Sequence, residues 1–357
     1  MRIINSVLGD ARGGRWQVVC DYSRLLQQQG HEVVMVLSDT LPADLHALPA
    51  DIEVLRVRNH GHYDWLAAWR LSRRLAGRQP ALAVAHCSRS VALLKRALGR
   101  SAPVIAVTHS TKVRRLLRAD AVIALTDALR EKIHSDPAGS RLPVYVVPNQ
   151  VGPLPDTCPP HQPLRQPPVI GALGRFDRVK GFDLYIDALG QLAKQGVAFT
   201  ARLAGGGEDA QSLSDQVHRL GLSGRVEIED WIPPGRVPAF LSGLDLLCVP
   251  ARSDAFGLTP LQGAATGVPM LLSDVSGHCA MFDDEREALF FEGDNASALA
   301  DRIRQFLTEP ALQKRLPPAA FERVVRCYSE PAVTQGLGEA FNNTLLLHNK
   351  TVNTNIK

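Results

Sequence analysis

The stretch VIGALGRFDRVKGFD, Val169–Asp183, combines an apolar run, a turn and the start of a helix. The apolar run ends at Gly174 and Arg175, and Lys180 and Gly181 then enter a helix. Short, nearly continuous apolar runs of this kind are typical of parallel strands that helices cover on both faces. The stretch therefore predicts one strand–helix unit of an α/β sheet.

The same alternation recurs on both sides of this stretch. An amphipathic segment such as WQVVCDYSRLLQQQG, which ends at Gly30, predicts a helix with a glycine at its C-terminus. Strands that alternate with helices indicate doubly wound α/β sheets. The apolar runs are RIINSVL, HEVVMVL, IEVLRV, LAVAHC, PVIAVTH, AVIALT and VYVVPN in the first half, and VIGALG, FTARLAG, RVEIED, LDLLCVP, MLLSD and ALFFE in the second.

A proline-rich segment separates the two halves. VGPLPDTCPPHQPLRQPP, Val151–Pro168, contains seven prolines, which remove backbone donors and oppose helix formation. We therefore expect two Rossmann-like parallel-sheet domains that face each other across a cleft. The expected boundaries are 1–152 for the first domain, 153–167 for the linker, 168–327 for the second domain, 328–347 for a C-terminal crossover helix and 348–357 for a disordered tail.

Composition narrows the class of protein. The chain has 357 residues, of which 45% are hydrophobic and 21% charged, as in ordinary globular proteins. No apolar run approaches the ~18–20 residues that cross a bilayer, and the N-terminus is typical of a first strand rather than a secretory signal. The six cysteines are scattered without CxxC spacing, so we expect reduced thiols, no metal cluster and a cytoplasmic location.

Charge is unevenly distributed along the chain. Residues 1–150 contain 21 Lys/Arg and 12 Asp/Glu, whereas the remainder contains 19 and 24. This surplus fits either a solvated basic face or contact with anionic lipid headgroups or a phosphorylated acceptor, since each Lys/Arg near a membrane contributes ~1 kcal/mol. The basic run TKVRRLLR, Thr111–Arg118, has no interleaved aromatic residues, so nucleic acid is not an expected partner.

The glycine-rich turns do not match dinucleotide or P-loop motifs. LGDARGG has glycines at 9, 13 and 14, and the glycines of LAGGGED are consecutive, so neither is GxGxxG. The pattern GxxxxGK[ST] is absent as well. A dehydrogenase and a P-loop enzyme are therefore not predicted.

Two basic residues follow the first strand of the second half. Ligands of open α/β sheets bind at the carboxyl ends of strands. Arg175 and Lys180 lie there beside a helix N-terminus, and together they predict a diphosphate-binding site. Ordinary surface charge is the alternative.

The stretch SDAFGLTPLQGAATGVP, Ser253–Pro269, indicates a second part of the same site. Pro260 is tolerated only in a first helical turn, so the helix begins near Leu258. Asp254 would lie in the preceding loop, and Gln262 would lean back toward the helix N-terminus. Both would reach one ligand, unless Asp254 only caps the helix.

These residues resemble glycosyltransferase family 4. GRFDRVKGFD, LAGGGED, RVEIEDWIP and DAFGLTPLQGAATGVPMLLSD occur in the order and spacing of that family, as do RGG, VTHS, ALTDALREKI and VPN. The resemblance covers nearly the whole chain and is closest to bacterial members that build lipopolysaccharide or other surface glycans. It implies the GT-B fold, an acceptor-side first domain, a second domain that binds the nucleotide-sugar, and retaining, metal-independent transfer.

The resemblance also implies residue roles. His109, Asp254, Arg175 and Lys180 would be catalytic, and His86 and Arg89 would lie on the acceptor side. Trp231 would lie beside the base, although a packed aromatic is the alternative. The donor would contact Gly13, Gly14, Gly174, Arg175, Lys180, Trp231, Ile232, Asp254, Phe256, Gly257, Leu258, Thr259 and Gln262.

The resemblance further implies the partners. These are a nucleotide-sugar co-substrate, with UDP favoured over GDP, no cofactor or metal, and a glycan or lipid-linked acceptor. Peripheral contact with the inner face of the cytoplasmic membrane would follow from the basic first domain.

Two positions depart from the family pattern. Asp254 stands where family members usually have a glutamate that contacts sugar hydroxyls, and Gln262 stands where they usually have a glutamate that binds the ribose hydroxyls. Asp254 keeps the charge, and Gln262 keeps an acceptor oxygen, although a hydrogen bond to a neutral group contributes ~1 kcal/mol against ~1.5–3 for a charged one. We expect an active enzyme with weaker donor binding or a changed donor preference. A non-catalytic nucleotide-sugar-binding relative and a nucleotide-sugar epimerase of the same fold are the alternatives.

Overall fold

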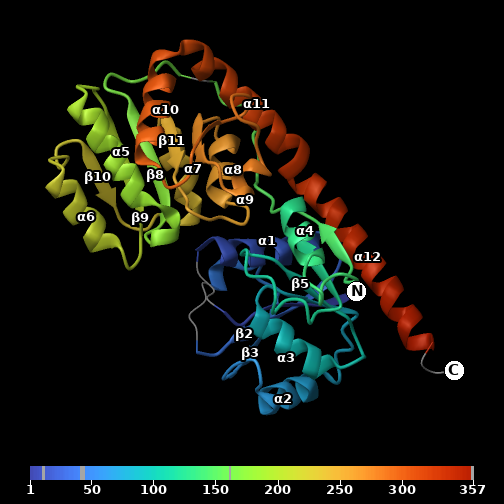
Figure 1. The fold of residues 1–357 in the computed structure, drawn as a ribbon. Coiled ribbons are helices and arrows are strands. Elements are labelled where there is room, and N and C mark those ends of the chain that lie inside the picture. The colour runs from blue at the N-terminus through green and yellow to red at the C-terminus, as the bar shows by residue number, and fades with distance from the viewer. Residues whose placement is uncertain (10–12, 41–44, 161, 355–357) are drawn as a thin grey trace. The chain divides into compact units, whose positions relative to one another are not determined.

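The computed structural model describes residues 1–9, 13–40, 45–160 and 162–354. The chain divides into two compact units, each built around its own parallel sheet (Figure 1). Unit 1 comprises Met1–Gln150 and Glu330–Lys357, and unit 2 comprises Val151–Ser329. Each unit is described separately.

Unit 1 contains a seven-stranded parallel sheet with the order β3-β2-β1-β4-β5-β6-β7. Its strands are β1 (Arg2–Val7), β2 (Glu32–Ser38), β3 (Glu53–Val57), β4 (Leu82–Ala85), β5 (Val104–Val107), β6 (Ala121–Ala124) and β7 (Val144–Val146). The chain winds outward from β1 in one direction and from β4 in the other. The carboxyl ends of β1 and β4 therefore form the topological switch point, where doubly wound sheets bind their ligands.

The helices of unit 1 begin where the sequence supplies capping groups. Asp64 accepts a hydrogen bond from the Ala67 amide at the start of α2, and Thr126 accepts one from Leu129 at the start of α4. The helices are α1 (Gly13–Gln28), the 3₁₀ helix η1 (Leu45–Ala47), α2 (Trp65–Leu75), α3 (Ser88–Leu98), α4 (Asp127–His134) and α12 (Glu330–Thr354). α12 contacts β7 of this unit, with Gly336 close to Val147.

Unit 2 contains a six-stranded parallel sheet with the order β10-β9-β8-β11-β12-β13. Its strands are β8 (Val169–Arg175), β9 (Thr200–Gly206), β10 (Val226–Glu229), β11 (Leu246–Val249), β12 (Met270–Ser273) and β13 (Leu289–Phe291). The helices are η2 (Arg178–Lys180), α5 (Phe182–Lys194), α6 (Ala210–Arg219), η3 (Pro234–Arg236), α7 (Val237–Ser242), α8 (Leu258–Ala265), α9 (Ser276–Cys279), α10 (Ala296–Thr308) and α11 (Pro310–Tyr328). The switch point of this sheet lies between β8 and β11.

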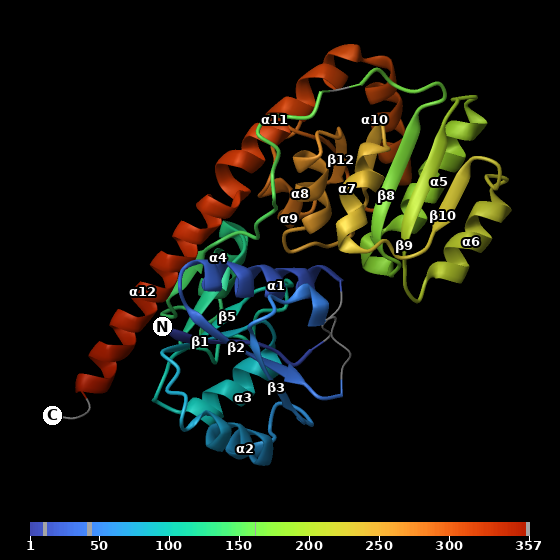
Figure 2. The same cartoon turned by 180° about the vertical axis from the view of Figure 1, so that it is seen from behind.

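Helices cover both faces of the second sheet, as Figure 2 shows from behind. Along β11, Leu246 and Cys248 join the core formed with α5 and α10. Leu247 points to the other face, where Gly263 of α8 lies so close that a Cβ there would be 2.6 Å from the leucine side chain. Successive side chains of β11 point to opposite faces of the sheet, and both faces are buried. The strand is therefore a continuous apolar run in the sequence.

The strands lie where the sequence predicted them, since each apolar run in the two halves contains one strand. The expected linker, 153–167, falls within unit 2, and its described residues form neither helix nor strand. The expected disordered tail is wrong for residues 348–354, because α12 continues to Thr354, while 355–357 lie outside the described residues. Propagation of an existing helix costs little, since each added residue gains a hydrogen bond. No helix among the described residues is both long and apolar enough to cross a bilayer.

The turn between η2 and α5 packs tightly on the end of β11. Gly181 has φ +69°, and a Cβ at this position would lie 2.0 Å from the Pro250 carbonyl oxygen. Gly196, at the other end of α5, has a similar φ of +75° but nothing within 4 Å of the added Cβ. Close approach, in addition to backbone conformation, therefore requires glycine at position 181.

We expect Gly181→Ala to destabilise the protein by about 2 kcal/mol more than Gly196→Ala. Both variants incur the left-handed penalty of ~1–2 kcal/mol, but only the first forces the loop after β11 to move. Urea unfolding of the two variants measures the difference. Equal losses of stability would show that the loop yields without cost.

Candidate functional site

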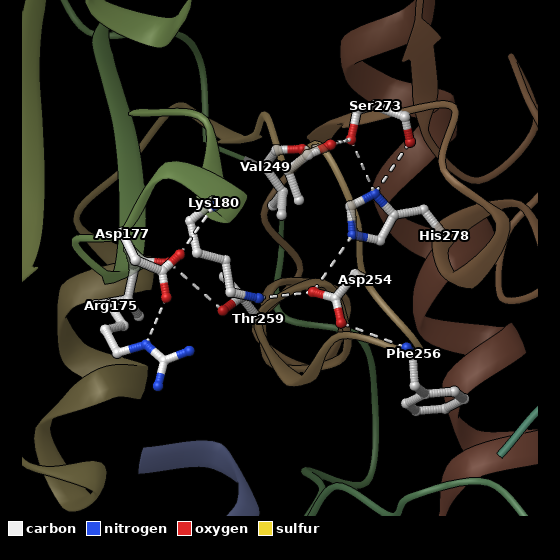
Figure 3. A network of polar contacts seen from close by, with 11 residues as sticks. Arg175, Asp177, Lys180, Val249, Asp254, Phe256, Thr259, Ser273 and His278 are labelled. Atoms are coloured by element: carbon white, nitrogen blue, oxygen red, sulfur yellow. Dashed lines mark hydrogen bonds and ion pairs between the residues drawn. The ribbon is translucent and has the colours of Figure 1, made fainter. Parts of the chain in front are cut away.

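The candidate site lies at the switch point of unit 2, where the carboxyl ends of β8 and β11 meet (Figure 3). β8 ends at Arg175, and the loop after β11 leads through Asp254 to α8. Parallel strands direct their carboxyl ends to one edge, so residues far apart in sequence come together there. The structure thus brings together the two stretches that the sequence singled out.

Lys180 and Asp254 form an ion pair at the centre of this site. The Lys180 Nζ lies 2.7 Å from Oδ2 of Asp254, whose side chain is only 14% exposed. Asp177 accepts a hydrogen bond from the Lys180 amide and so positions the lysine backbone. Burial alone would raise the pKa of Asp254, but the charge and hydrogen bond of Lys180 outweigh it and lower the pKa. Asp254 is therefore ionised at neutral pH.

His278 of α9 lies beside this ion pair and is fully buried. Its Nδ1 is 3.0 Å from the Ser273 carbonyl oxygen, an acceptor, so Nδ1 carries the proton in the neutral ring. Its Nε2 lies 4.0 Å from Oδ2 of Asp254 and has no hydrogen-bond partner among the described residues. Burial lowers the pKa of His278, so the ring is neutral at pH 7 and its unshared electron pair lies at Nε2.

Sequence reasoning missed His278, because no motif marks it within SDVSGHCAMFDDE. The one local sign is the preceding glycine. A Cβ on Gly277 would lie 2.4 Å from the Asp254 carbonyl oxygen, so only glycine lets α9 approach the loop this closely.

The N-terminus of α8 has no side-chain cap. Gly257 is the N-cap residue, and no side chain accepts a hydrogen bond from the first turn, which contains Leu258 and Thr259. The alternative that Asp254 caps this helix is wrong, since its Oδ1 accepts from the Phe256 amide at 3.4 Å, ahead of the helix. The amides of the first turn, together with the positive end of the helix dipole, suit an anionic ligand.

Arg175 lies at the edge of the site. Its Nε donates to Oδ2 of Asp177 at 2.6 Å, and its side chain is 62% exposed. In Figure 3 the two terminal nitrogens of its guanidinium group have no dashed contact with the other residues drawn. Arg175 can therefore turn its remaining donors toward a ligand, whereas Lys180 is already paired.

Arg252 holds the loop after β11 against η2 and α5, a role that sequence reasoning missed. Its guanidinium forms two hydrogen bonds of 2.7 Å with the Asp183 carboxylate and one of 2.6 Å with Asp294. It also donates to the Arg178 carbonyl oxygen at 2.9 Å. A bidentate pair of this kind fixes geometry as well as charge.

The other predicted donor residues differ in accessibility. Trp231 is 50% exposed, so the alternative of a packed aromatic is wrong. Phe256 is buried, with its ring edge-on to Tyr328, and only its backbone remains for a ligand. The Gln262 side chain is half-buried and forms no hydrogen bond with a described residue. Gly174 and Ile232 are half-buried.

In unit 1 the two predicted histidines touch each other. His86 Nδ1 lies 2.9 Å from His109 Nε2 at the carboxyl ends of β4 and β5, and the rings stack with their centroids 5.1 Å apart. Burial, followed by the charge of Arg15, lowers the pKa of His109 to about 3, and burial also lowers the pKa of His86. The two rings are therefore a neutral, hydrogen-bonded pair at pH 7. Arg15, in the first turn of α1, was not predicted.

The remaining unit 1 candidates lie at the starts of α1 and α3, the helices that follow β1 and β4. Gly13, with φ +62°, and the exposed Gly14 begin α1. Residues 10–12, which connect β1 to α1, lie outside the described residues. Arg89 is half-buried in the first turn of α3 and belongs to a group of arginines around His62.

We expect His109 to make stability depend on pH below neutrality. Its pKa is near 3 in the folded chain and near 6.5 when unfolded, so between these values only the unfolded state binds the proton. The stabilisation is therefore complete above pH 6.5 and falls as the pH is lowered, by about 2 kcal/mol between pH 7 and pH 5. Urea unfolding of His109→Gln should show a correspondingly smaller loss over that range, and an unchanged pH dependence would contradict this assignment.

Comparison with known proteins supplies the family. The model for Glycosyl transferases group 1 matches residues 159–323, and the model for Glycosyltransferase Family 4 matches residues 12–152. The 2-deoxystreptamine glucosyltransferase of Streptomyces kanamyceticus is 26% identical over 277 residues, covering 74% of this chain and 70% of that protein. The lipopolysaccharide core mannosyltransferase LpsB of Rhizobium meliloti is 28% identical over 173 residues. That match covers 46% of this chain and 48% of LpsB, so the chain spans about half the length of this relative.

Solved structures agree on the fold. Anabaena HepE, solved with UDP and glucose, aligns with a TM-score of 0.79 and 17% identity over 96% of this chain and all of that chain. The lipopolysaccharide outer core galactosyltransferase WaaB aligns with a TM-score of 0.77 and 16% identity over 96% of this chain and 99% of its own. With both halves matched and two parallel-sheet units in place, the chain belongs to the group 1 and family 4 glycosyltransferases and has their GT-B fold.

Proposed function

We propose that this glycosyltransferase moves a hexose from a nucleotide-sugar, UDP-linked in preference to GDP-linked, to a glycan or lipid-linked acceptor. Transfer proceeds with retention and without a metal, in the assembly of lipopolysaccharide or another surface glycan. The single observation that carries the proposal is the Lys180–Asp254 ion pair, held beside the uncapped N-terminus of α8. HepE, solved with UDP, and the lipopolysaccharide relatives support the choice of donor and pathway.

The donor diphosphate would bind where positive groups converge. The amides of Leu258 and Thr259 and the guanidinium of Arg175 are available donors, since no side chain caps the helix and Arg175 is mostly exposed. Lys180 completes the set. Phosphate oxygens would compete with the Asp254 carboxylate for the Lys180 ammonium group, because the phosphate and the carboxylate are both anions that can pair with the same Nζ.

This competition assigns a role to Asp254. Once Lys180 turns toward a phosphate, the carboxylate has an oxygen free to accept a hydrogen bond from a sugar hydroxyl. Asp254 is ionised, and a charged acceptor binds a hydroxyl more strongly than a neutral one. The aspartate therefore fulfils the role of the family's glutamate with one methylene less.

The chemistry needs positioning and electrostatic stabilisation more than a protein base. As the bond between the sugar and the diphosphate breaks, negative charge gathers on the leaving phosphate, where Lys180, Arg175 and the α8 amides stabilise it. The leaving phosphate accepts the proton of the incoming acceptor hydroxyl as the new glycosidic bond forms on the same face of the sugar. His109 contributes a hydrogen bond to the donor sugar. Because its ring is neutral at pH 7, it carries no positive charge that would attract the donor phosphates away from Lys180 and Arg175.

Acceptor binding belongs to unit 1 in this proposal. Its residues 1–150 carry the basic surplus, which suits a phosphorylated or lipid-linked acceptor at an anionic membrane. His86 contacts His109 directly and so links the acceptor side to the residue that we assign to the donor sugar.

A thermal-shift panel with UDP, GDP, ADP, CMP and their sugar conjugates tests the donor. A ligand at 100 times its dissociation constant stabilises the fold by ~2.7 kcal/mol, so we expect UDP to raise the melting temperature by several degrees. A larger shift with one UDP-sugar would identify the sugar. The absence of any shift with all of these nucleotides and conjugates would contradict the donor site.

Lys180→Ala should reduce kcat at least about 100-fold, because removal of one preorganised donor to a developing anion costs ~2.7–4 kcal/mol. Lys194→Ala, which removes an exposed lysine from α5, is the matched control and should retain full activity. Single-turnover transfer of a radiolabelled sugar measures both. Since Lys180→Ala leaves the Asp254 charge unpaired, its melting temperature is recorded as well, and full activity in the folded variant would overturn the proposal.

Gln262→Glu tests the ribose assignment separately. A restored carboxylate should bind the ribose hydroxyls more strongly and leave donor affinity unchanged or increased. Isothermal titration with UDP measures the affinity. Weaker UDP binding by Gln262→Glu would show that position 262 does not contact the ribose.

A further inference from the structure

The outer face of α2, together with the loop residue Tyr63 just before it, carries a cluster of exposed aromatic and aliphatic side chains. Tyr63 is 70% exposed, Trp65 69%, Leu66 53% and Trp69 55%. The inner face of the same helix contributes Ala67, Ala68, Leu71 and Leu75 to the core. Single exposed apolar residues are ordinary, but four large ones within seven positions mark an interaction surface.

Arginines surround this cluster. Between positions 56 and 74 the chain has one acidic residue, Asp64, and its carboxylate is used locally, accepting from the amides of His60 and Ala67 at 2.9 Å. No arginine of this segment pairs with a carboxylate of the described residues. We call the four apolar residues and these arginines the α2 face; the arginines are Arg56, Arg58, Arg70, Arg73 and Arg74.

The α2 face is hollowed as well as charged. All five arginines line one surface hollow of about 390 Å³, and Trp69 forms part of its wall. Arg56 and Arg74 each donate one hydrogen bond to a backbone carbonyl oxygen, so part of their donor capacity is already in use. The remaining guanidinium donors suit the oxygens of a phosphate group.

Stacked guanidinium groups extend the face to a second basic region. Arg96 lies 4.7 Å from the ring centroid of Trp65 and 5.6 Å from that of Tyr63, and Arg118 lies 6.0 Å from Tyr63. Such cation–π contacts hold the rings in place on the surface. Arg118 also lines a hollow of about 460 Å³ together with Arg114 and Arg115.

The face adjoins the acceptor-side edge of unit 1. The loop that carries Tyr63 follows the carboxyl end of β3, and His62 Nε2 in that loop lies 2.9 Å from the Ser88 hydroxyl. Ser88 begins α3, two residues after His86. A partner bound at the α2 face is therefore held beside the residues assigned to the acceptor.

We propose that the α2 face binds the surface of an anionic lipid bilayer, with Trp65, Leu66 and Trp69 entering the boundary between headgroups and acyl chains. Tryptophan and tyrosine prefer this boundary, where an apolar ring body and a polar edge are both satisfied. The arginines bind lipid phosphates around them, as on an interfacial amphipathic helix. Leu66 has no stacking or hydrogen-bonding use on nucleic acid or a glycan, whereas a lipid surface accommodates it.

This inference deepens the membrane contact of the proposed function, which rested on net charge alone. It names the surface and adds an apolar contribution that charge does not predict. A chain bound to the bilayer through the α2 face would present its acceptor-side edge to lipid-linked acceptors in the same bilayer. The lipid test below needs no nucleotide-sugar, so its failure is separate from failure of the donor site.

Vesicle sedimentation of the full chain tests the surface. Vesicles contain phosphatidylcholine with or without 30 mol% phosphatidylglycerol. We expect Trp65→Ser/Trp69→Ser to weaken binding to the anionic vesicles at least about tenfold. Leu346→Ser/Leu347→Ser, which removes two exposed leucines from α12, is the matched control and should bind like the native chain. Unchanged binding by the tryptophan variant, or no binding by the native chain, would overturn the proposal.

The arginine contribution is tested in the same assay. One Lys/Arg near an anionic surface changes partitioning about fivefold, so Arg70→Gln/Arg73→Gln should weaken binding roughly 25-fold at low salt. Arg219→Gln/Arg315→Gln removes two exposed arginines of unit 2 as the control. An equal loss in both variants would show that binding follows total charge and would contradict a defined face.

Brominated lipids report whether the rings enter the bilayer. They quench tryptophan at the boundary, so the native chain should lose fluorescence on anionic brominated vesicles. Trp65→Phe/Trp69→Phe keeps the apolar surface and removes the reporters, and it should bind normally while the quenching disappears. Persistent quenching in that variant, or binding to single-stranded nucleic acid with none to vesicles, would overturn the inference. UDP thermal shifts of all these variants should match the native chain, because their changes lie outside the donor site.

Discussion

The close approach of two loops at the switch point of unit 2 is the constraint on which the donor site depends. Gly181 and the Pro250 carbonyl oxygen leave no room for a side chain, and Arg252 ties the same loop to Asp183. With the loops held in this way, Lys180 reaches Asp254 and α8 begins beside them. Catalytic groups of an enzyme that works by positioning need such a rigid base, because a small displacement forfeits much of the rate.

The two units differ in how their charged and titratable groups are arranged. In unit 2 the Lys180–Asp254 ion pair lies at the switch point, where we propose that an incoming diphosphate recruits the lysine, and the uncapped amides of α8 carry no competing charge. Unit 1 keeps its two histidines neutral through burial, so they offer hydrogen bonds without an added charge. Five of its arginines lie instead on the α2 face, where they line one surface hollow. On our proposal, these basic residues serve association with an anionic bilayer, whereas sugar transfer uses few charges.

Much of the architecture could be predicted from residue patterns. Parallel strands covered on both faces must be apolar throughout, so each run such as that ending at Gly174 marked a strand. The position of Arg175, Lys180 and Asp254 at one edge of the sheet could be predicted as well, because the carboxyl ends of parallel strands lie together there; their roles toward a ligand stay predictions. His278, Arg15 and Arg252 could not be predicted, since no sequence motif marks them and each lies beside a charged or titratable group distant in sequence. The polar composition of residues 348–357 suggested a disordered tail, but α12 continues to Thr354, because each residue added to an existing helix gains a hydrogen bond.

The sequence by itself determined the two-sheet α/β class, the glycosyltransferase family and the residue types at the candidate site. These follow from local periodicity and motif spacing, which depend only on neighbours along the chain. Only the tertiary structure decided which side chains meet: Lys180 with Asp254, His86 with His109, and the arginines with the tryptophans of α2. Such contacts depend on strand order and loop packing, and burial then decides their charge, because a pKa responds to surroundings in space rather than to position in the chain.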